Sequence, residues 1–196
     1  MFIDAVPEQD ATDEVAAYYA GQRSGWGFLP NYAACFASRP DVARAWNALN
    51  ATIRDGMDRR RFELATIAAA RELRSSYCTV AHSKFLRDVC GDAQSLVEIA
   101  RDPSGASLEG LDREVYGFAA KVARDASSIT GADVGRLREA GLSDAEVADV
   151  VFAASARAFF TKVLDGLGAQ LDVETAAAFA PELLASMIVG RPAADH

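Results

Sequence analysis

The sequence contains few of the residues and patterns that define secreted and membrane proteins. Its three cysteines, Cys35, Cys78 and Cys90, are odd in number and irregularly spaced, which argues against a disulfide framework and favours a reducing compartment. No apolar stretch reaches the ~20 residues of a membrane span. Residues 1–8 also lack the basic and apolar regions of a secretory signal. We therefore expect a cytoplasmic protein without a membrane partner.

Basic residues are also in short supply. The chain has 20 Lys and Arg against 28 Asp and Glu, a formal net charge of −8 and a sequence pI of about 4.8. A nucleic-acid-binding protein needs a concentrated cationic face, because it binds by displacing counterions from phosphates. The one basic run is Arg59, Arg60 and Arg61, which we interpret as the solvated first turn of a helix. The sequence thus predicts no nucleic-acid partner.

Only two histidines are present, and one of them is the C-terminal His196. His82 is therefore the single credible imidazole for proton transfer. One imidazole, one thiol and one carboxylate supply at most three ligands, and their spacing matches no structural zinc pattern. No glycine-rich phosphate loop follows a strand pattern. We expect neither a metal nor an organic cofactor.

The residues that are abundant favour helices. Hydrophobic residues make up 51% of the 196 positions, alanine is frequent, and proline is scarce inside the long apolar stretches. Alanine loses no side-chain entropy in a helix, and no alternating strand pattern longer than a few residues competes with it. A chain of this length buries a core without disulfides. We predict one all-α domain over residues 1–196.

This predicted domain has three parts. Residues 1–40 are an N-terminal arm, with a short helix at 11–20 and an aromatic loop at 21–30 that packs onto the body or onto a partner subunit. Residues 41–101 are a motif-bearing half, and residues 108–190 are a second helical half. Caps and breakers place helices at about 41–56, 58–74, 76–91, 92–101, 111–125, 130–141 and 143–168, and from 172 onward with an interruption at Pro181 and a frayed tail after Gly190.

A weak internal echo connects the two halves. The run 56–58 and the run 141–143, 85 residues later, both precede a helix with a similar apolar pattern. Either an internal duplication or the use of similar helix-capping residues explains this similarity. Under the alignment, the second half carries Phe160, Val163 and Leu167 at the positions of Ser75, Cys78 and His82. We therefore assign the chemistry to the first half alone.

Cys78 and His82 are the centre of the predicted chemistry. They lie four residues apart, so on a helix their side chains share a face and come within hydrogen-bond reach, directly or through water. With Ser75 or Ser76 as the cap, Cys78 falls in the first turn, where unpaired N–H groups and the helix dipole favour a thiolate. A lowered thiol pKa beside a base is what an activated sulfur nucleophile requires.

Glu63 is the candidate third member. It lies twelve residues before Ser75, near the start of the preceding helix. If the two helices pack antiparallel, Glu63 and His82 lie toward matching ends, and the carboxylate can orient the imidazole or hold a water for it. Its apolar neighbours would raise the pKa of a buried Glu63.

A structural role remains open for each of these residues. A lone cysteine in an alanine-rich helix is more often a small core residue than a nucleophile. A lone histidine is usually structural, and a first-turn glutamate often only complements the helix dipole. The conjunction of all three with a Ser-Ser cap makes the catalytic and structural interpretations about equally supported.

The segment from Glu63 through Ser75-Ser76-Tyr77-Cys78 to His82 resembles the core motif of the alkylhydroperoxidase D-like family, within the carboxymuconolactone decarboxylase superfamily. That motif is Glu, eleven residues, Cys-x-x-Cys, three residues, His. The segments Trp26-Gly27-Phe28-Leu29-Pro30-Asn31 and Gly141-Leu142-Ser143-Asp144 also resemble the subgroup of peroxidase-related proteins. The resemblance therefore spans nearly the whole chain.

The resemblance implies an alkylhydroperoxidase D-like helical bundle that assembles as dimers, trimers or hexamers. It implies that Cys78 is the cysteine that attacks peroxide, with His82 as its proton-relay partner and Glu63 as the carboxylate of that relay. Ser75 departs from the pattern, because the family's first cysteine stands at this position. In the family that cysteine closes a disulfide with the second one, which a dithiol partner such as a lipoylated protein reduces. Serine cannot do this.

Other cysteines offer no clear replacement. Cys90 lies twelve residues beyond Cys78, about 18 Å along one helix, whereas a disulfide needs Cα atoms within about 7 Å. The sequence does not place Cys35. A small thiol or a cysteine of a neighbouring subunit is left to resolve a sulfenic acid on Cys78.

We predict first a one-cysteine peroxidase, an antioxidant oxidoreductase in which Cys78 attacks a small hydroperoxide and a thiol reductant restores it. Here Ser75 caps the helix and hydrogen-bonds the sulfur. The first alternative is a decarboxylase- or isomerase-type enzyme in which His82 and Glu63 perform acid–base work. The second is a non-catalytic helical assembly protein.

Overall fold

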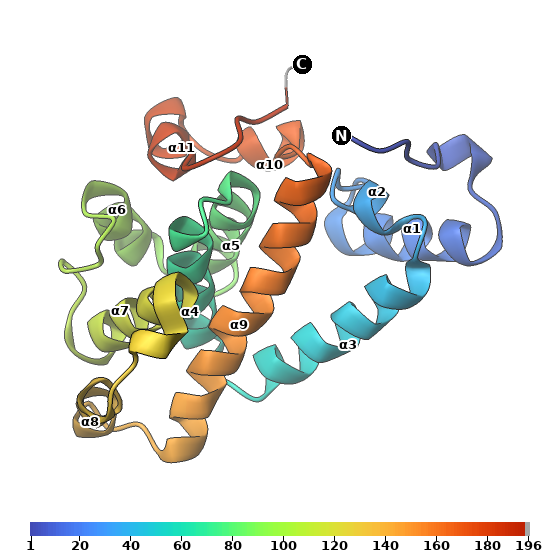
Figure 1. The fold of residues 1–196 in the computed structure, drawn as a ribbon. Coiled ribbons are helices and arrows are strands. Elements are labelled where there is room, and N and C mark those ends of the chain that lie inside the picture. Colours follow the sequence, from blue (N-terminus) through green and yellow to red (C-terminus); the bar gives the residue numbers. More distant parts are fainter. Residues whose placement is uncertain (195–196) are drawn as a thin grey trace.

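The computed structural model describes residues 1–194, and every regular element in that part of the chain is a helix (Figure 1). The predicted all-α class is confirmed. None of these helices is long and apolar enough to cross a membrane. Two short 3₁₀ turns, Glu8–Asp10 and Ala126–Ser128, accompany α1 (Asp13–Trp26), α2 (Ala33–Phe36), α3 (Pro40–Asp55), α4 (Arg59–Glu72), α5 (Ser76–Asp88), α6 (Ala93–Arg101), α7 (Gly110–Asp125), α8 (Gly131–Glu139), α9 (Asp144–Leu167), α10 (Val173–Ala176) and α11 (Pro181–Met187).

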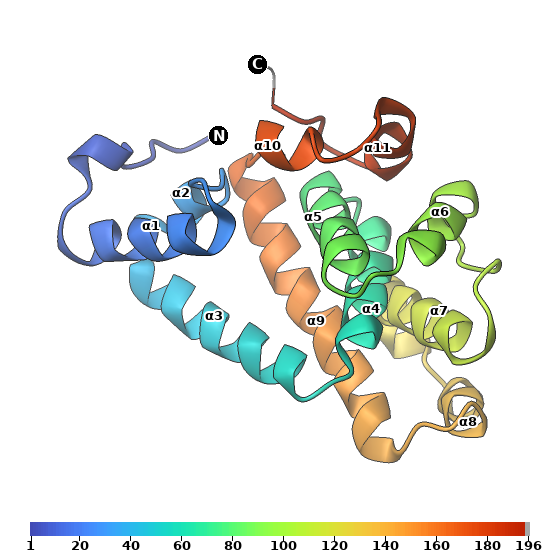
Figure 2. The ribbon, with the colours of Figure 1, turned by 180° about the vertical axis from the view of Figure 1, so that it is seen from behind.

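Helix α4 is the centre of the packing. Every residue from Phe62 to Ala70 is buried, because α4 packs against α5, α7 and α9 on its different sides (Figures 1 and 2). A helix that is apolar all round belongs in a core, and four small residues, Ala65, Ala68, Ala69 and Ala70, let the neighbouring helices approach closely. Two polar residues, Thr66 and the charged Glu63, interrupt this stretch, and both are fully buried.

Most helix starts follow the predicted caps. The Asp58 carboxylate accepts a hydrogen bond from the Arg61 backbone N–H at 2.9 Å, and Asp92 does the same for Ser95. Ser143 and Glu146 form the predicted capping box at the start of α9. These side chains satisfy N–H groups that the helix itself leaves unpaired. The long helix ends at Gly168, whose φ of 79° suits glycine.

The N-terminal arm differs from its prediction. The predicted loop at 21–30 is helical up to Trp26, so α1 runs six residues beyond the expected end and stops at Gly27, with φ 82°. Gly21 and Gly25 do not break the helix. Tertiary packing compensates for their low helix propensity, since the ring of Trp26 contacts that of Phe85 on α5, with centroids 5.4 Å apart.

The C-terminal segment is also corrected. Instead of one interrupted helix, the chain forms two short helices, α10 and α11. Pro181 is the first residue of α11, a position that tolerates proline because its N–H would be unpaired in any case. Residues 189–194 contain no helix. The end of the predicted frayed tail, 195–196, lies outside the described residues.

A tight turn sets the relation of α4 to α5. Arg74 adopts a positive φ of 58°, and the Ser75 N–H bonds back to the Ala70 carbonyl at 2.9 Å. The chain thereby reverses, and α5 packs along α4. At the far end, Arg61 on α4 bonds to Glu146 on α9 at 2.8 Å. These contacts fix three of the helices that surround the site.

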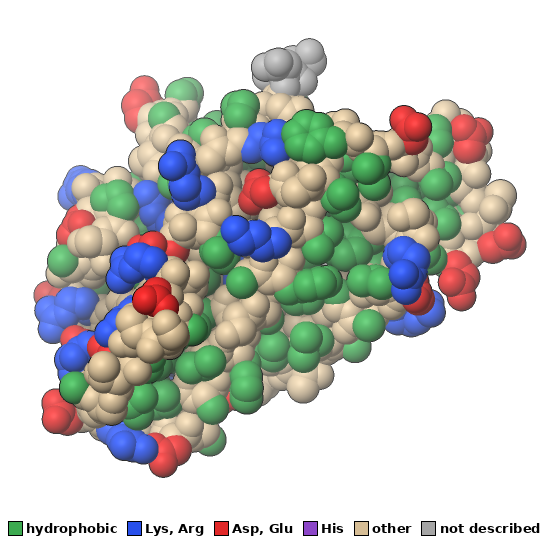
Figure 3. All heavy atoms as spheres, viewed as in Figure 1, with side chains coloured by type: hydrophobic (Ala, Val, Ile, Leu, Met, Phe, Trp, Pro, Cys, Tyr) green, Lys and Arg blue, Asp and Glu red, His purple; other side chains and the backbone are tan. Residues whose placement is uncertain are grey.

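One face of the molecule exposes large apolar side chains. Leu49 on α3 is 53% exposed, and Phe152 and Phe159 on α9 are 54% and 45% exposed. The two helices lie side by side in Figure 1, and Figure 3 shows hydrophobic side chains gathered along them. We call these three residues the α3–α9 face.

The capping box gives a stability test. Ser143→Ala removes the hydroxyl that accepts from the Glu146 N–H, so we expect a loss of about 1 kcal/mol in the free energy of unfolding, measured by urea denaturation. Ser24→Ala is the matched control, since Ser24 is exposed within α1 and alanine is the better helix former. Equal stability of the two variants would contradict the role of the cap.

Candidate active site

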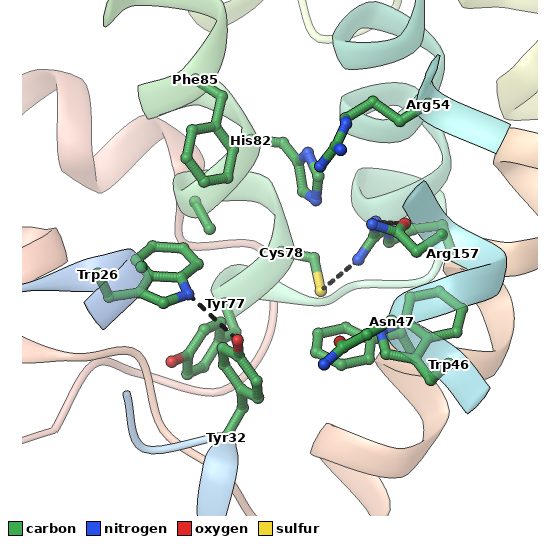
Figure 4. A pocket seen from close by; sticks show the side chains of 14 residues that line it. Trp26, Tyr32, Trp46, Asn47, Arg54, Tyr77, Cys78, His82, Phe85 and Arg157 are labelled. Atoms are coloured by element: carbon green, nitrogen blue, oxygen red, sulfur yellow. Dashed lines mark hydrogen bonds between the residues drawn. The ribbon is translucent and has the colours of Figure 1, made fainter. Parts of the chain in front are cut away.

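Cys78 and His82 open onto one cavity of about 240 Å³ (Figure 4). Both residues lie on the face of α5 that looks toward α3 and α9. Their predicted juxtaposition on one helical face is therefore present in the structure. The residues that line the cavity come from α1, the segment before α2, α3, α5 and α9: Gly25, Trp26, Tyr32, Trp46, Asn47, Asn50, Arg54, Tyr77, Cys78, Ala81, His82, Phe85, Arg157 and Phe160.

Glu63 contacts His82, as we predicted from antiparallel packing of the two helices. Its Oε2 lies 2.6 Å from Nδ1 of His82, and its Oε1 accepts a hydrogen bond from Nε of Arg59 at 2.6 Å. A carboxylate bound at Nδ1 holds the proton on that nitrogen. The other ring nitrogen, Nε2, is then the acceptor of a neutral imidazole. Figure 4 shows a ring nitrogen directed toward the space above Cys78.

The environment keeps His82 neutral. Burial, reinforced by the positive charge of Arg157, lowers the pKa of His82 to about 4, against the smaller opposing effect of Glu63. For Glu63, burial alone would raise the pKa, but the charges of and hydrogen bonds from His82 and Arg59 outweigh it and lower the pKa. The expected rise in the pKa of Glu63 is therefore wrong, because this carboxylate is buried together with its donors.

Arg157 lies beside the thiol. Its Nη1 is 3.8 Å from Sγ of Cys78, and its Nη2 donates weakly to Oδ1 of Asn50 at 3.4 Å. Arg157 is 3% exposed, and its guanidinium carbon lies 5.7 Å from the ring centroid of Trp46 and 5.4 Å from that of Phe160, beside these two stacked rings. Figure 4 shows it reaching across the cavity to the sulfur. A cation at this distance stabilises the thiolate over the thiol.

The Cys78 thiol does not have the lowered pKa that its first-turn position predicted. Burial raises the pKa, and the charge of Arg157 and weaker polar contacts with Ser75 only partly oppose it. Cys78 is 1% exposed, so a thiolate would lose most of its hydration. The resting residue is therefore a thiol, and it needs a base such as His82 to ionise.

Ser75 takes the N-cap position of α5, but its hydroxyl makes no capping bond. Within the described residues this buried oxygen has no hydrogen-bond partner of ordinary length. Its effect on Cys78 is a longer polar contact that lowers the thiol pKa. The predicted capping bond is wrong, because the hydroxyl lies instead near the Cys78 thiol and the Asp165 carboxyl, and it opposes the rise in both pKa values.

Arg157 and the aromatic residues of α1 and α3 were not predicted as part of the site. The second half also contributes to the cavity, since Arg157 lies on α9. One signal was available. Arg157 is a lone charge within the run Ala153-Ala154-Ser155-Ala156-Arg157-Ala158-Phe159-Phe160, and a charge within a buried apolar helix points to a partner or a site.

The prediction for the basic run at the start of α4 is also corrected. Instead of a solvated turn, each arginine has an acidic partner: Arg59 bonds to Glu63, Arg60 bonds to Asp92 and Asp112, and Arg61 bonds to Glu146. Arg59 therefore belongs to the support of the site, since it holds the carboxylate that orients His82.

Within residues 1–194 all three cysteines are free. Cys35 and Cys90 do not line the cavity. Cys35 is buried, and burial raises the pKa of its thiol to about 11. No group of three or more His, Cys, Asp or Glu side chains in the described chain is arranged to hold a metal ion.

Comparison with known families identifies the central segment. Residues 40–120 match the carboxymuconolactone decarboxylase family. This segment contains α3 to α6 and most of α7, and so it includes Glu63, Cys78 and His82 but not Arg157. Among curated proteins, none matches the sequence.

Solved structures match over nearly the whole chain. An alkylhydroperoxidase AhpD core, an uncharacterized peroxidase-related protein from Ralstonia eutropha JMP134, has a TM-score of 0.75 at 23% identity, with 95% of this chain and 96% of that chain covered. A peroxidase-related protein from Silicibacter sp. TM1040 has a TM-score of 0.74 at 23% identity, with 89% and 91% covered. These similarities confirm the predicted alkylhydroperoxidase D-like fold.

A third structural neighbour has a different activity. The debrominase Bmp8, as a cysteine-to-alanine variant in complex with 2,3,4-tribromopyrrole, has a TM-score of 0.73 at 14% identity, with 95% of this chain and 97% of that chain covered. Proteins that share this fold therefore carry different activities, so the fold alone does not identify the reaction.

The neutral state of His82 predicts an acid-labile protein. An unfolded histidine has a pKa near 6.5 and the buried one about 4, so below pH 6.5 the unfolded state binds the extra proton. The stabilisation is complete above that value and is lost as the pH falls toward 4. From pH 7 to pH 5 we expect the free energy of unfolding to fall by about 2 kcal/mol from this residue.

Urea unfolding at the two pH values measures this loss. His82→Gln retains an N–H donor for Glu63 but cannot titrate, and so it should lose less stability than the parent over the same interval. The same pH dependence in both proteins would show that other groups cause the acid lability.

Proposed function

We propose that the chain is a member of the carboxymuconolactone decarboxylase superfamily, because residues 40–120 match that family, and that it is a thiol-dependent oxidoreductase that reduces small hydroperoxides through Cys78. One observation carries the proposal. A buried thiol lies beside a guanidinium, at 3.8 Å from Nη1 of Arg157, in the cavity that a neutral His82 also lines. These are the parts that an activated sulfur nucleophile requires.

The first step is removal of the thiol proton. His82 is the base, because its Nε2 is unprotonated at neutral pH and Glu63 fixes the tautomer through Nδ1. Both side chains line the same cavity, and the proton passes between them directly or through one bridging water. Arg157 then faces the new thiolate and compensates for the hydration that burial removes.

The thiolate attacks the terminal oxygen of the hydroperoxide. The S–O bond forms as the O–O bond breaks, and Cys78 becomes a sulfenic acid. The leaving alkoxide takes the proton from His82 and departs as an alcohol. Two equivalents of a small thiol then return the sulfenic acid to the thiol, with release of water and a disulfide of the reductant.

Ser75 and the positions of the other cysteines support an external reductant. Ser75 cannot form a disulfide, and neither Cys35 nor Cys90 lines the cavity. We therefore propose a one-cysteine cycle with a thiol reductant as a partner. In this cycle Ser75 contributes a polar contact that favours the thiolate. A cytoplasmic location, where such thiols are present, remains a prediction.

A second candidate is acid–base catalysis of the decarboxylase or isomerase type. The observation that favours it is that Arg59, Glu63 and His82 form a continuous series of hydrogen bonds in which Cys78 takes no part. His82 would take a proton from a carbon acid in the cavity, and Cys78 would be only a wall residue. The two candidates differ in their need for sulfur.

We also propose that the protein is a homo-oligomer that associates through the α3–α9 face. Leu49, Phe152 and Phe159 are about half exposed there, and a patch of large apolar side chains is costly to leave in water. The ring of Phe159 packs on Trp46, a cavity residue, with centroids 5.4 Å apart. Association would therefore bring a second subunit close to the active site.

The peroxidase proposal predicts that Cys78→Ser abolishes hydroperoxide reduction, because a serine hydroxyl does not form a sulfenic acid. His82→Ala should lower kcat/KM by about 10²-fold or more through loss of the base. The measurement is thiol-coupled peroxide consumption, with mass spectrometry of dimedone-labelled sulfenic acid at Cys78. Cys90→Ser is the matched control and should retain activity.

Full retention of turnover in Cys78→Ser, on any substrate found for the enzyme, would favour the acid–base candidate instead. An unoxidised Cys78 after stoichiometric hydroperoxide would also contradict the peroxidase proposal.

The oligomer proposal predicts that Phe152→Glu dissociates the assembly to the 20.9 kDa chain, since a buried unpaired carboxylate is not tolerated at an apolar interface. Light scattering coupled to size exclusion measures the mass. Val89→Glu is the control, because Val89 is equally exposed, at 59%, but lies outside the α3–α9 face. A monomeric parent protein would overturn this proposal.

A further inference from the structure

The cavity at Cys78 combines aromatic rings with polar and cationic side chains. Six side chains surround the space beside the thiol, and they come from different parts of the chain. Trp26 packs on Phe85 with centroids 5.4 Å apart, and Tyr32 packs on Phe160 with centroids 5.3 Å apart. The six are Trp26, Tyr32, Trp46, Tyr77, Phe85 and Phe160.

Such walls favour a flat apolar ligand, because ring edges and faces attract one another beyond the burial of area. The cavity volume, about 240 Å³, lies below the ~300–1,000 Å³ of sites for drug-sized ligands. The space therefore suits a molecule with one ring. Hydrogen peroxide or a short alkyl hydroperoxide would leave most of these rings without a contact.

The cavity also carries positive charge and no acid. Two arginines, Arg54 and Arg157, line it, and none of the lining residues is Asp or Glu. Arg54 is partly exposed and bonds to Asp55 at 2.9 Å. Glu63, the buried carboxylate of the site, is already bonded to Arg59 and His82. The charge of Arg157 therefore has no counterion among the described residues of the site.

This lack of a counterion is unusual for so buried a cation. Arg157 is 97% enclosed, its Nε has no hydrogen-bond partner within residues 1–194, and its Nη groups make only the long contacts with Cys78 and Asn50. A buried charge costs several kcal/mol unless it is paired. A thiol is a poor partner, and so the site is incomplete without an anion from outside.

We propose that this cavity binds small aromatic carboxylates, with the ring among the six aromatic side chains and the carboxylate on Arg157. A guanidinium presents two parallel N–H donors that match a planar carboxylate. Asn47 and Asn50 of α3 supply further polar groups at the same wall. The carboxylate then lies next to Sγ of Cys78, because Nη1 contacts both.

For catalysis, this inference rests on the proposed function and names its substrate class. The matching substrate is an aryl peroxycarboxylic acid. The Cys78 thiolate attacks the terminal peroxide oxygen, the O–O bond breaks, and the aryl carboxylate leaves with the electron pair while the sulfur gains the hydroxyl. Arg157 faces the oxygens on which that negative charge develops, which is where electrostatic stabilisation accelerates a reaction.

The binding itself can be tested without any reaction. The chain has two tryptophans, Trp26 and Trp46, and both line the cavity. Intrinsic fluorescence therefore reports occupancy directly. We would titrate the full-length Cys78→Ser protein with benzoate, benzamide, cyclohexanecarboxylate and acetate at constant ionic strength.

We expect benzoate to bind about tenfold or more tightly than benzamide, which has the same shape without the charge, because a hydrogen bond to a charged group is stronger than one to a neutral group. Benzoate should also bind more tightly than cyclohexanecarboxylate and acetate. Arg157→Gln should remove the preference for benzoate over benzamide. Arg113→Gln, the same charge change at an exposed position on α7, should leave it intact.

Equal affinity for benzoate and benzamide, or no binding of either, would overturn the inference, and this comparison of ligands does not depend on how well the Arg157 variant folds. Equal affinity for acetate or cyclohexanecarboxylate would overturn its aromatic part. If benzoate binds but Cys78 of the parent protein is not oxidised by hydroperoxide, the inference about binding is supported and only the peroxidase proposal is contradicted.

Discussion

The hydrogen bond between Glu63 and His82 is the constraint on which the rest of the site depends. A fully buried carboxylate is tolerated only with donors in place, and here they come from two directions, Nδ1 of His82 and Nε of Arg59. This requirement fixes α5 against α4 in one register. It also fixes the imidazole tautomer, and with it the nitrogen that is left free to accept a proton beside Cys78.

The second buried charge, Arg157, is positive and, unlike Glu63, is not paired with an opposite charge within residues 1–194. It reaches the thiol from α9 and packs beside the stacked rings of Trp46 and Phe160, and no carboxylate in the described part of the chain bonds to it. Its positive charge lowers the pKa of His82 and opposes the rise in the pKa of Cys78. Arg157 thus adds to the effect of burial in keeping the base neutral, and it partly offsets the effect of burial on the thiol. An enclosed cation of this kind is poised for an anion that forms or binds during the reaction.

The site is assembled around α4 and α9 rather than within a single motif. The small alanines of α4 let α5 and α9 approach on different sides, so that Cys78 and Arg157, 79 positions apart, become neighbours. Helix α3 and the end of α1 close the cavity with aromatic rings. The fold is shared with peroxidase-related proteins and with a debrominase, and in this chain the cavity wall includes six aromatic residues and two arginines.

The sequence by itself determined the helices and the local part of the site. Caps such as Asp58 and Ser143 act within one turn, and the four-residue spacing of Cys78 and His82 places both on one face of any helix. The pairing of Glu63 with His82 followed from one assumption, that a short turn makes two helices antiparallel. These interactions are local or nearly so, which is why pattern and spacing were sufficient.

Only the tertiary structure decided the remaining features. The pKa of Cys78 depends on burial and on a cation from another helix, so the position of the thiol in its own helix gave the wrong direction. The extension of α1 through two glycines depends on the contact of Trp26 with Phe85. The positive charge in the cavity depends on Arg157, which contacts Cys78 from a position 79 residues further along the chain. Burial and long-range electrostatics are properties of the assembled bundle, and no single segment of the sequence encodes them.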